Sequence, residues 1–444
     1  MSLDSRLFVH EKDLSSLEAL KAIPGFTSFV KSFMKNWNEK QFRIQNMSSR
    51  LRISKEQLPK YYAMLEDVCE KMEIDVPEIY LELNVVPNAY TYGDDKPFIV
   101  VTSGLIETIP DELIPSVLAH ECGHIVCHHT LYTTMGSLIL NGMASMIPAA
   151  LRGLVTLPLQ MAFAYWMRCS EFSADRAAMI YDGGSEHMIE VCMRLAGYGK
   201  FIEDKADPDV FIKQAEEYRE FVNDSKKNQT MEFLLLAGQT HPLTAVRAYE
   251  CREWSGSDAY HQIMTYWTEH REGRDHSQIP LFETVQSYVG KNAQAAEKEL
   301  RDLGFRNIKT ETTSEKGKNT GRDDITDIRI NGLNETEGCT WFDADTPVQI
   351  TYYEPFVSVQ DRIMHPDEAQ LPGINDFFAG KNCSEVYQMF IDAGFTNVII
   401  EKSDKKGIFA KQGSVVNVTV DQRTRYDLGE WVSRNAQIVI YYVR

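Results

Sequence analysis

The sequence predicts an α+β protein, in which a mainly helical N-terminal part holds a small β-sheet and two small α/β repeats follow it. Apolar residues recur at helical spacing through most of residues 1–275. Between residues 78 and 103 they instead alternate or form a short continuous run, as they do in strands. After residue 284, several short stretches recur 90 residues further along the chain, which predicts a repeated unit.

Helices are predicted for residues 1–75 and again from 168 to about 275. Ser54 and Gln57 match the S-x-x-Q capping box that begins a helix, and apolar residues follow them at helical spacing. The later segment combines apolar positions at this spacing with a polar face. Both patterns are typical of amphipathic helices that pack on a shared core.

A hairpin-like pair of strands, followed by a helix, is predicted between these two helical segments. Residues 79–83 alternate in polarity, 92–97 contain the glycine and proline of a turn, and 98–101 are apolar. The next helix is predicted from about Asp111 to about His129, because acidic residues stabilise the positive end of a helix.

The C-terminal part consists of two similar stretches. Residues 289–292 recur as 379–382, and each copy precedes a short amphipathic stretch, a glycine turn and strand-like runs. Three prolines mark a linker at about 354–373. We therefore expect three domains, with the bounds 1–275, 284–353 and 374–444.

Composition and charge exclude several classes of protein. The 444 residues include 46 basic and 64 acidic side chains, a net charge of −18 that is spread along the chain, so we expect no nucleic-acid partner. The first residues lack the basic and apolar regions of a secretory signal. The eight cysteines form no C-x-x-C pair, which favours reduced thiols and a cytoplasmic location.

The motif with the clearest chemistry is H-E-x-x-H, formed by His120, Glu121 and His124. Positions i and i+4 share one face of a helix, so both imidazoles can reach one Zn²⁺ ion. Glu121 lies beside that face, where it can take a proton from water. Apolar residues around the motif favour a buried helix over an exposed one with solvated histidines.

A hydrolytic zinc site needs a third protein ligand, for which Glu171 is the candidate. Glu171 and Asp175 share one helical face, so Glu171 can bind the metal while Asp175 orients a ligating histidine. Taken alone, this pair is an ordinary acidic helix face. Its occurrence after H-E-x-x-H favours the ligand interpretation.

Four other residues near the motif compete as ligands. His128 lies one turn beyond the motif on the same face, too far for the same ion, and His129 is out of phase. Both are expected to be residues of the helix end, where a cation is favoured. Cys122 and Cys127 are soft ligands in principle, but we expect them to be core thiols.

Four motifs, in order, make the sequence similar to the M48 metallopeptidases, which include the bacterial heat-shock membrane protease and the CAAX-processing proteases. They are the stretch from Asn88 to Leu105, H-E-x-x-H, R-x-x-E-x-x-A-D at 168–175, and T-H-P at 240–242 with Arg247. The resemblance covers about residues 15–250. It departs from the family pattern at Cys122, where leucine or isoleucine is usual.

The resemblance implies a zincin-type catalytic domain and a role for each matching residue. His120, His124 and Glu171 would bind zinc, and Glu121 would be the general base. His241 would stabilise the oxyanion, with Arg247 nearby, although a helix-start turn also explains His241 and the proline after it. Asn88, Ala89 and Tyr90 would form an edge strand that pairs with an extended substrate, the alternative being a plain hairpin edge.

Residues 131–167 raise the question of membrane contact. Residues 131–151 carry no charge and are long enough to cross about 30 Å of hydrocarbon, but they contain several polar residues and a proline. We prefer a buried helical pair near the active site. Peripheral contact with a membrane is the alternative.

The two C-terminal repeats resemble PASTA domains. The shared pattern is V-G-K, a helix ending in G-F, and strands that end in a V-x-I-x-Y run, over about 284–353 and 374–442. PASTA domains usually lie outside the cell, where some bind peptidoglycan fragments, so a protein or glycan ligand is implied. Because no secretory signal is recognised, we prefer a protein-interaction or spacing role.

The leading functional hypothesis is a zinc metalloendopeptidase that hydrolyses peptide or protein substrates through a zinc-activated water. The alternative is a catalytically silent scaffold that binds through its PASTA-like repeats. The complete set of His120, Glu121, His124 and Glu171 favours the enzyme, because a scaffold has no need of it.

Overall fold

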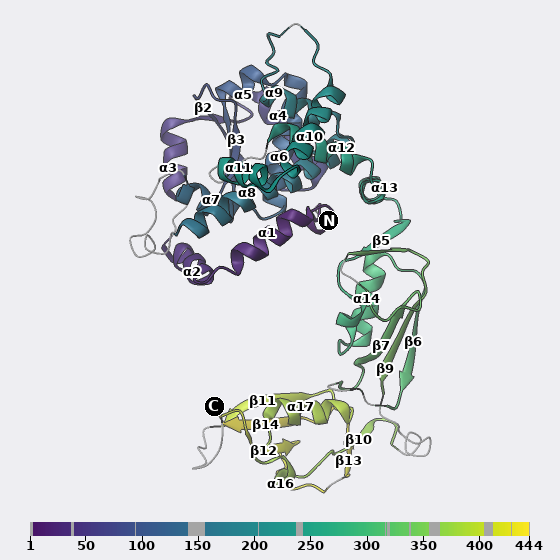
Figure 1. The fold of residues 1–444 in the computed structure, drawn as a ribbon. Helices are drawn as coiled ribbons and strands as arrows, with labels where there is room; N and C mark the ends of the chain where they lie inside the picture. The colour runs from purple at the N-terminus through teal and green to yellow at the C-terminus, as the bar shows by residue number, and fades with distance from the viewer. Residues whose placement is uncertain are drawn as a thin grey trace. The chain divides into compact units, whose positions relative to one another are not determined.

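The computed structural model divides the chain into two compact units, Met1–Thr268 and Glu269–Arg444, and each is described by itself (Figure 1). The residues it describes are 3–36, 40–93, 95–140, 156–202, 204–236, 243–315, 317, 320–336, 339–354, 365–403, 412–427 and 429–443.

The first unit is mainly helical, as the apolar spacing predicted. A short 3-10 turn, Asp111–Leu113, precedes helix α6. The helices are α1 Glu11–Lys21, α2 Phe26–Asn36, α3 Lys40–Ser49, α4 Pro59–Met72, α5 Ser103–Thr108, α6 Ile114–Val126, α7 Thr130–Leu140, α8 Leu157–Asp182, α9 Glu186–Leu195, α10 Pro208–Asn223, α11 Lys226–Leu236, α12 Thr244–Ser255 and α13 Asp258–Arg271, which continues into the second unit.

The sheet of this unit differs from the predicted hairpin. Among the described residues it has four strands in the order β1-β2-β4-β3, with the bounds Leu51–Ile53, Glu78–Glu82, Phe98–Thr102 and Ala89–Tyr92 in that order. β2 and β4, the two segments predicted to pair as a hairpin, are parallel neighbours. The hairpin partner of β4 is instead β3, which the polarity pattern did not predict but which overlaps the edge strand that the family resemblance implied. Strand β1 also lies in a segment predicted to be helical, because β2 offers it a sheet edge.

The predicted capping box forms a turn rather than a helix end. The hydroxyl of Ser54 accepts hydrogen bonds from the backbone N–H groups of Glu56 and Gln57. The side chain of Gln57 donates to Arg52 instead of returning to Ser54. Helix α4 then begins at Pro59, which is favoured at the first helical position because it has no N–H to satisfy.

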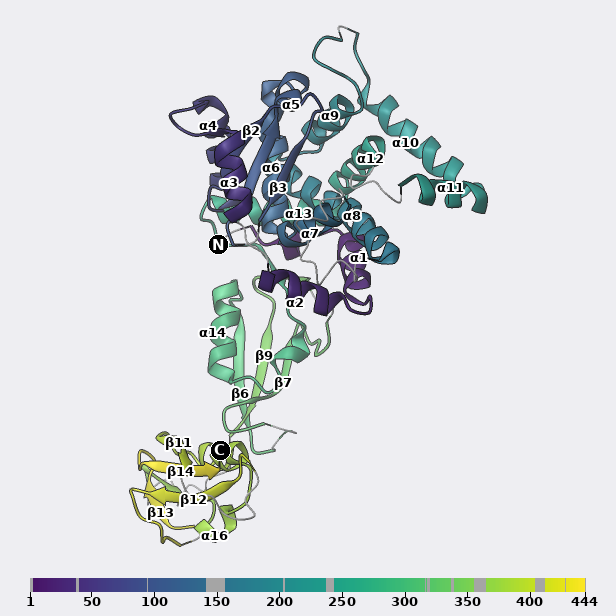
Figure 2. The ribbon, with the colours of Figure 1, turned by 90° about the vertical axis from the view of Figure 1, so that its left-hand side faces the viewer.

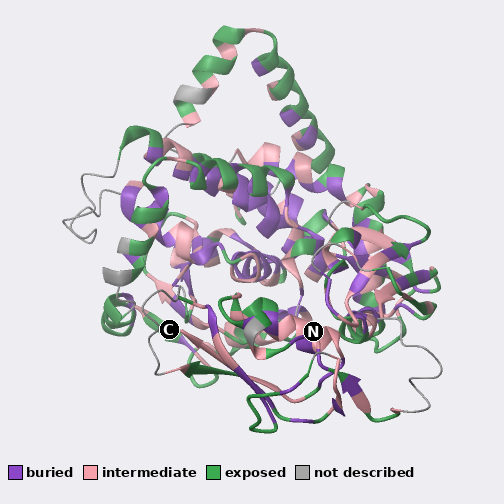
Figure 3. Cartoon of the chain, turned by 90° about the horizontal axis from the view of Figure 1, so that it is seen from below, coloured by how far each residue is buried: buried purple, intermediate pink, exposed green. Residues whose placement is uncertain are grey.

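Helices α6 and α8 pack closely against one another in the interior of the unit, and the sheet lies beside α6 (Figure 2). Gly123 of α6 permits this approach, since a Cβ atom there would lie 2.7 Å from Cβ of Ala177 and 3.1 Å from Cα of Ala174. Individual helices divide into buried and exposed sides, drawn in purple and green in Figure 3. A core of aromatic and aliphatic residues joins the N-terminal helices to α7 and α8, including Leu20, Phe29, Phe33, Phe163 and Trp166.

We predict that Gly123→Ala weakens both folding and metal binding. The added methyl has to push α6 away from α8, and overpacking of this kind typically lowers the free energy of unfolding by about 1–3 kcal/mol. Gly199→Ala is the matched control, because a Cβ atom at Gly199 meets nothing within 4 Å. Thermal unfolding and metal titration of both variants measure the effect. Equal behaviour of the two variants would contradict the packing argument.

The second unit contains the predicted repeat, with corresponding elements 90 or 91 residues apart. The first copy holds β5 Gln278–Leu281, a 3-10 turn Val285–Tyr288, α14 Ala293–Leu303, β6 Ile308–Thr313, β7 Ile325–Ile330, β8 Thr340–Asp343 and β9 Val348–Tyr353. The second copy holds β10 Glu368–Gln370, α16 Asn375–Phe378, α17 Cys383–Asp392, β11 Val398–Ser403, β12 Val415–Val420, β13 Trp431–Ser433 and β14 Ile438–Val443.

Both copies have the same topology and separate apolar cores. The first forms a three-stranded sheet β6-β9-β7 and a strand pair β5-β8, and the second forms β11-β14-β12 and β10-β13. The helices α14 and α17 pack on the three-stranded sheets. The cores are built around residues such as Leu300 and Ile350 in one copy and Phe390 and Ile440 in the other. The predicted α+β class, with two small α/β repeats, is therefore confirmed.

Strands β5 and β10 begin earlier than the predicted repeat bounds of 284 and 374. β10 also lies inside the predicted linker at 354–373, of which residues 355–364 are outside the described residues.

Of the uncharged segment 131–167, residues 141–155 are likewise outside the described part, and the flanking residues belong to α7 and α8. Within the described residues, none of the helices is long and apolar enough to span a bilayer.

Candidate metal centre

Helix α6 carries the H-E-x-x-H motif in the interior of the first unit. His120, Glu121 and His124 are all buried, with 4 to 7% of their surface exposed. The helix has Pro115 in its first turn, where proline is tolerated, and it ends at Val126, three residues before the predicted end near His129. Its i, i+4 spacing places both imidazoles on the side that faces α8.

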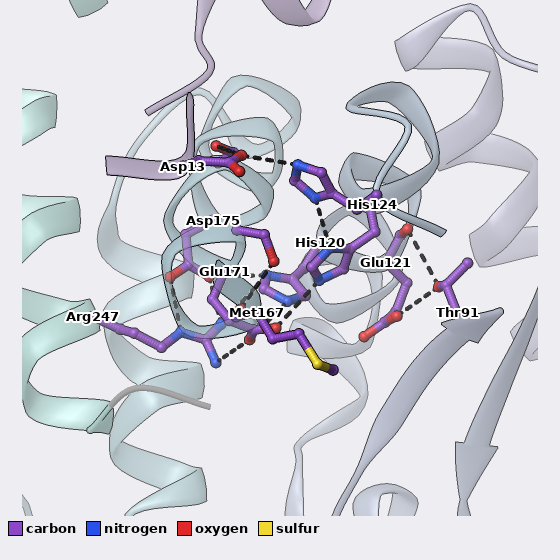
Figure 4. A network of polar contacts seen from close by, with 12 residues as sticks. Asp13, Thr91, His120, Glu121, His124, Met167, Glu171, Asp175 and Arg247 are labelled. Carbon is purple, nitrogen blue, oxygen red and sulfur yellow. Dashed lines mark hydrogen bonds and ion pairs between the residues drawn. The ribbon is translucent and has the colours of Figure 1, made fainter. Parts of the chain in front are cut away.

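Helix α8 supplies the acidic residue that meets these histidines. Nε2 of His120 lies 3.5 Å from Oε2 of Glu171, and Nε2 of His124 lies 3.4 Å from Oε1 of the same carboxylate (Figure 4). One donor atom from each of the three residues lies within 4.8 Å of the others. The packing of α6 on α8 therefore brings together three side chains that are separated by up to 51 positions in the sequence.

A second carboxylate and an arginine contact His120 and Glu171. Nδ1 of His120 lies 2.9 Å from Oδ1 of Asp175, as predicted for an orienting residue. Nε of Arg247 donates to Oδ2 of Asp175 at 2.8 Å, and Nη1 lies 3.2 Å from Oε2 of Glu171. Arg247 is itself buried, so its guanidinium pairs with two carboxylates away from bulk water.

These contacts set the charges of the group. Burial lowers the pKa of His120, but hydrogen bonds with Asp175 and Glu171 outweigh it and raise that pKa to about 9. Burial also lowers the pKa of His124. Burial would raise the pKa of Asp175, yet the charge of Arg247 and the hydrogen bond with His120 hold it below its usual value. Glu171 and Asp175 thus both pair with the buried guanidinium of Arg247. Because the pKa of His120 is raised, a proton competes with a metal ion for this imidazole.

The general-base candidate Glu121 contacts the edge strand of the sheet. The hydroxyl of Thr91, in β3, donates to Oε2 of Glu121 at 2.6 Å (Figure 4). Thr91 is buried and was not identified in the sequence, because nothing in local spacing links a strand residue to a helix residue 30 positions later. Ala89 and Tyr90 begin the same strand, and Asn88 directly precedes it.

His129 is the clearest difference from the sequence prediction. His128 adopts a left-handed conformation with φ of 55°, which reverses the chain after α6. As a result, Nδ1 of His129 lies 3.0 Å from Nδ1 of His124, and Nε2 of His129 lies 2.9 Å from Oδ2 of Asp13 in α1. His129 is therefore a buried contact of a predicted ligand, a role that its interpretation as a helix-end residue did not include. The available signal for Asp13 was a charged residue on the same face of α1 as the buried Leu20, two turns away.

The remaining residues singled out in the sequence are His241 and the two cysteines near the motif. His241 lies outside the described residues, so its oxyanion role stays a prediction. The cysteines of α6 and its end are free thiols, as expected. The Cys69 thiol and burial raise the pKa of Cys122, and burial raises that of Cys127, which favours inert thiols over ligands.

The donor set fits a divalent transition metal. Two imidazole nitrogens and one carboxylate oxygen are the ligands of many hydrolytic zinc sites, which keep a further position for water or substrate. The histidines turn their Nε2 atoms toward Glu171, while their Nδ1 atoms contact Asp175 and His129. Such outer contacts fix the orientation of ligating rings.

Comparison with solved structures returns parts of Ser/Thr kinases, one of them a three-PASTA-domain. The three-PASTA-domain of a Ser/Thr kinase from Staphylococcus aureus matches 38% of this chain and 66% of its own, with 11% identity and a TM-score of 0.14. The extracellular region of the Ser/Thr kinase PrkC from Staphylococcus aureus matches 36% and 47%, with 14% identity and the same TM-score.

Comparison of sequences identifies the first unit. The model of peptidase family M48 matches residues 57–255. The plastoglobule-localized metallopeptidase 48 of Arabidopsis thaliana, a chloroplast protein, is 32% identical over 268 residues, which cover 59% of this chain and 76% of the relative. Protease HtpX of Legionella pneumophila is 24% identical, covering 43% and 75% of the two chains. A Protease HtpX homolog of Sulfurihydrogenibium is 34% identical over 94 residues, only 31% of its length. The chain belongs to peptidase family M48.

Proposed function

We propose that the protein is a zinc-dependent metalloendopeptidase. The observation that carries this proposal is the buried group of His120, His124 and Glu171, whose donor atoms face one another within 4.8 Å beside Glu121. Membership of a peptidase family supports the reaction class. The choice of zinc rests on the ligand types, since two histidines and one carboxylate form the protein ligands of known zinc peptidases.

In the proposed reaction, Glu121 moves the proton. Its carboxylate accepts a proton from the attacking water and delivers it to the amine that leaves, as a general base and then a general acid. The hydrogen bond from Thr91 restrains Oε2 of Glu121. A zinc ion held by His120, His124 and Glu171 would supply a Lewis acid that polarises the scissile carbonyl and makes water more acidic.

We propose that β3 pairs with an extended substrate, through the segment Asn88, Ala89 and Tyr90. β3 is at the edge of the described sheet, with β4 on its inner side. The carbonyl of Asn88 accepts from the N–H of Thr102, and hydrogen-bonded pairs alternate along an antiparallel ladder. Backbone groups of Ala89 and Thr91 then point outward, toward an added strand.

We also propose roles for Arg247, His241 and the C-terminal repeats. We propose that Arg247 is a positioning residue, because it contacts Asp175 and Glu171 rather than an open position. His241 stays the predicted oxyanion group. We keep the division into a catalytic domain of residues 1–275 and two repeats, 284–353 and 374–444, that act as interaction or spacing modules with a protein or glycan ligand. The cytoplasmic location and membrane contact through 131–167 also stay predictions.

Metal analysis tests the proposed function directly. We expect the purified full-length chain to bind one zinc ion and to cleave casein, and we expect a chelator to abolish cleavage and added zinc to restore it. His124→Asn removes a ligand and is expected to lose both the metal and the cleavage. His261→Asn, at an exposed position of α13, is the matched control. One zinc per chain without cleavage of any peptide would instead favour the scaffold hypothesis.

A further inference from the structure

Each of the two predicted histidine ligands has a partner at Nδ1, but the two partners differ. Nδ1 of His120 contacts the carboxylate of Asp175 directly. Nδ1 of His124 contacts a second imidazole, that of His129, which in turn contacts the carboxylate of Asp13. His124 is thus connected to a carboxylate through one extra ring.

The carboxylate at the end of this connection is buried and fully engaged. Asp13 is 1% exposed. Its Oδ1 accepts a hydrogen bond from Nε1 of Trp166 at 3.0 Å, and its Oδ2 accepts from the hydroxyl of Ser173 at 2.6 Å and lies 2.9 Å from Nε2 of His129. Burial would raise the pKa of Asp13, but the hydrogen bonds with His129, Ser173 and Trp166 hold it below its usual value. Asp13 therefore acts as an acceptor at both oxygens.

This arrangement fixes where the ring protons lie. An ionised carboxylate can only accept, so Nε2 of His129 donates to Asp13. In a neutral imidazole the other nitrogen is then an acceptor, so Nδ1 of His129 accepts the proton on Nδ1 of His124. The lone pair of His124 is consequently left on Nε2, the atom that faces Glu171.

We propose that Asp13 and His129 are positioning residues of the metal centre, which together orient His124 and fix the tautomer that binds metal. The inference rests on the proposed function and adds two residues to it. Asp13 belongs to α1, which lies outside residues 57–255 matched by the family model. Through Asp13, the N-terminal helix then supports the metal centre of this chain.

Asp13→Asn tests the fixed tautomer with little change in shape. An amide has one acceptor and one donor end, so it cannot accept from both Trp166 and His129, as the carboxylate does. With its nitrogen toward Trp166, the amide places two donors face to face, and with its nitrogen toward His129 it makes Nε2 of His129 an acceptor and reverses the protons on both rings. Because the second case leaves a proton on Nε2 of His124, we expect affinity for Co²⁺ and Zn²⁺ to fall about 10–100-fold. The measurement is competition with a chromophoric chelator on the full-length chain. Glu11→Gln, on the same helix with a side chain 81% exposed, is the matched control.

His129 offers a pair of variants that separates positioning from mere packing. The amide of His129→Gln can still accept from His124 and donate to Asp13, whereas His129→Leu can do neither. We expect His129→Leu to bind Co²⁺ about 10–100-fold more weakly, and His129→Gln to recover part of the loss. At saturating Co²⁺, the visible absorption of the leucine variant is expected to differ from that of wild type, because the orientation of His124 changes.

The outcomes distinguish this inference from the proposed function. A wild-type chain that binds no metal refutes the metal centre itself. Wild-type binding with unchanged affinity in folded Asp13→Asn and His129→Leu variants leaves the metal centre intact and overturns only the role of Asp13 and His129. Equal losses in the glutamine and leucine variants overturn the proposed hydrogen-bonded connection. Circular dichroism of each variant confirms that it is folded.

Discussion

A Glu121→Gln variant is expected to keep its metal and to lose peptide hydrolysis by about 10²–10⁴-fold in kcat. The amide of glutamine has nearly the shape of the carboxylate and can still accept the hydrogen bond from Thr91, but it cannot take a proton from water. The three predicted ligands are untouched by the change. The loss should therefore appear in the rate of the chemical step and not in metal content.

The measurement combines turnover of a fluorogenic peptide with elemental analysis of the same sample. Glu112→Gln is the matched control, because Glu112 is exposed in the turn that precedes α6. We expect its turnover to equal that of wild type. A fully metal-loaded Glu121→Gln variant that retains more than a tenth of wild-type turnover would exclude Glu121 as the general base.

Arg247→Met is expected to have the largest effect on stability, a loss of about 3–5 kcal/mol in the free energy of unfolding. Removing the guanidinium leaves the buried carboxylates of Asp175 and Glu171 without the arginine that pairs with both. The charge of Arg247 is a main cause of the lowered pKa of Asp175, so this pKa should rise in the variant. Methionine fills much of the volume of the arginine side chain. The loss in the free energy of unfolding therefore measures the removal of the charge rather than the creation of a cavity.

Denaturant unfolding in the presence of a chelator measures this loss without a contribution from bound metal. Arg252→Met is the matched control on the same helix, since Arg252 is exposed at the surface and pairs with the exposed Asp209 at 3.1 Å. Exposed pairs of this kind contribute about 0–1 kcal/mol. Arg247→Lys should fall between wild type and Arg247→Met, because lysine keeps the charge without the planar fork that contacts both carboxylates. Equal stabilities of the two methionine variants would contradict this account.

The sequence was most informative where chemistry depends on local spacing. The i, i+4 intervals of His120 and His124, and of Glu171 and Asp175, follow from helical geometry alone, so their shared faces were predictable. The 90-residue period likewise predicted that the C-terminal part repeats one fold, and corresponding helices and strands recur at that interval or within one residue of it.

The sequence was misleading where one backbone conformation or one distant partner decides the outcome. The predicted motif helix ran to about His129, whereas the left-handed conformation of His128 follows its end and folds His129 back on His124. The segments around β2 and β4 have strand-like patterns, but polarity does not specify the direction of pairing. The intervening β3 makes the hairpin, and so β2 and β4 are parallel.

By itself the sequence determined which residues can bind a metal and that two similar units follow the catalytic part. Only the tertiary structure decided what surrounds those residues: Thr91 on Glu121, Arg247 behind Glu171 and Asp175, and Asp13 reaching His124 through His129. The physical reason is that these contacts join residues 30 to 116 positions apart. Their existence depends on how α1, α6, α8, α12 and β3 pack together, and no local spacing records that packing.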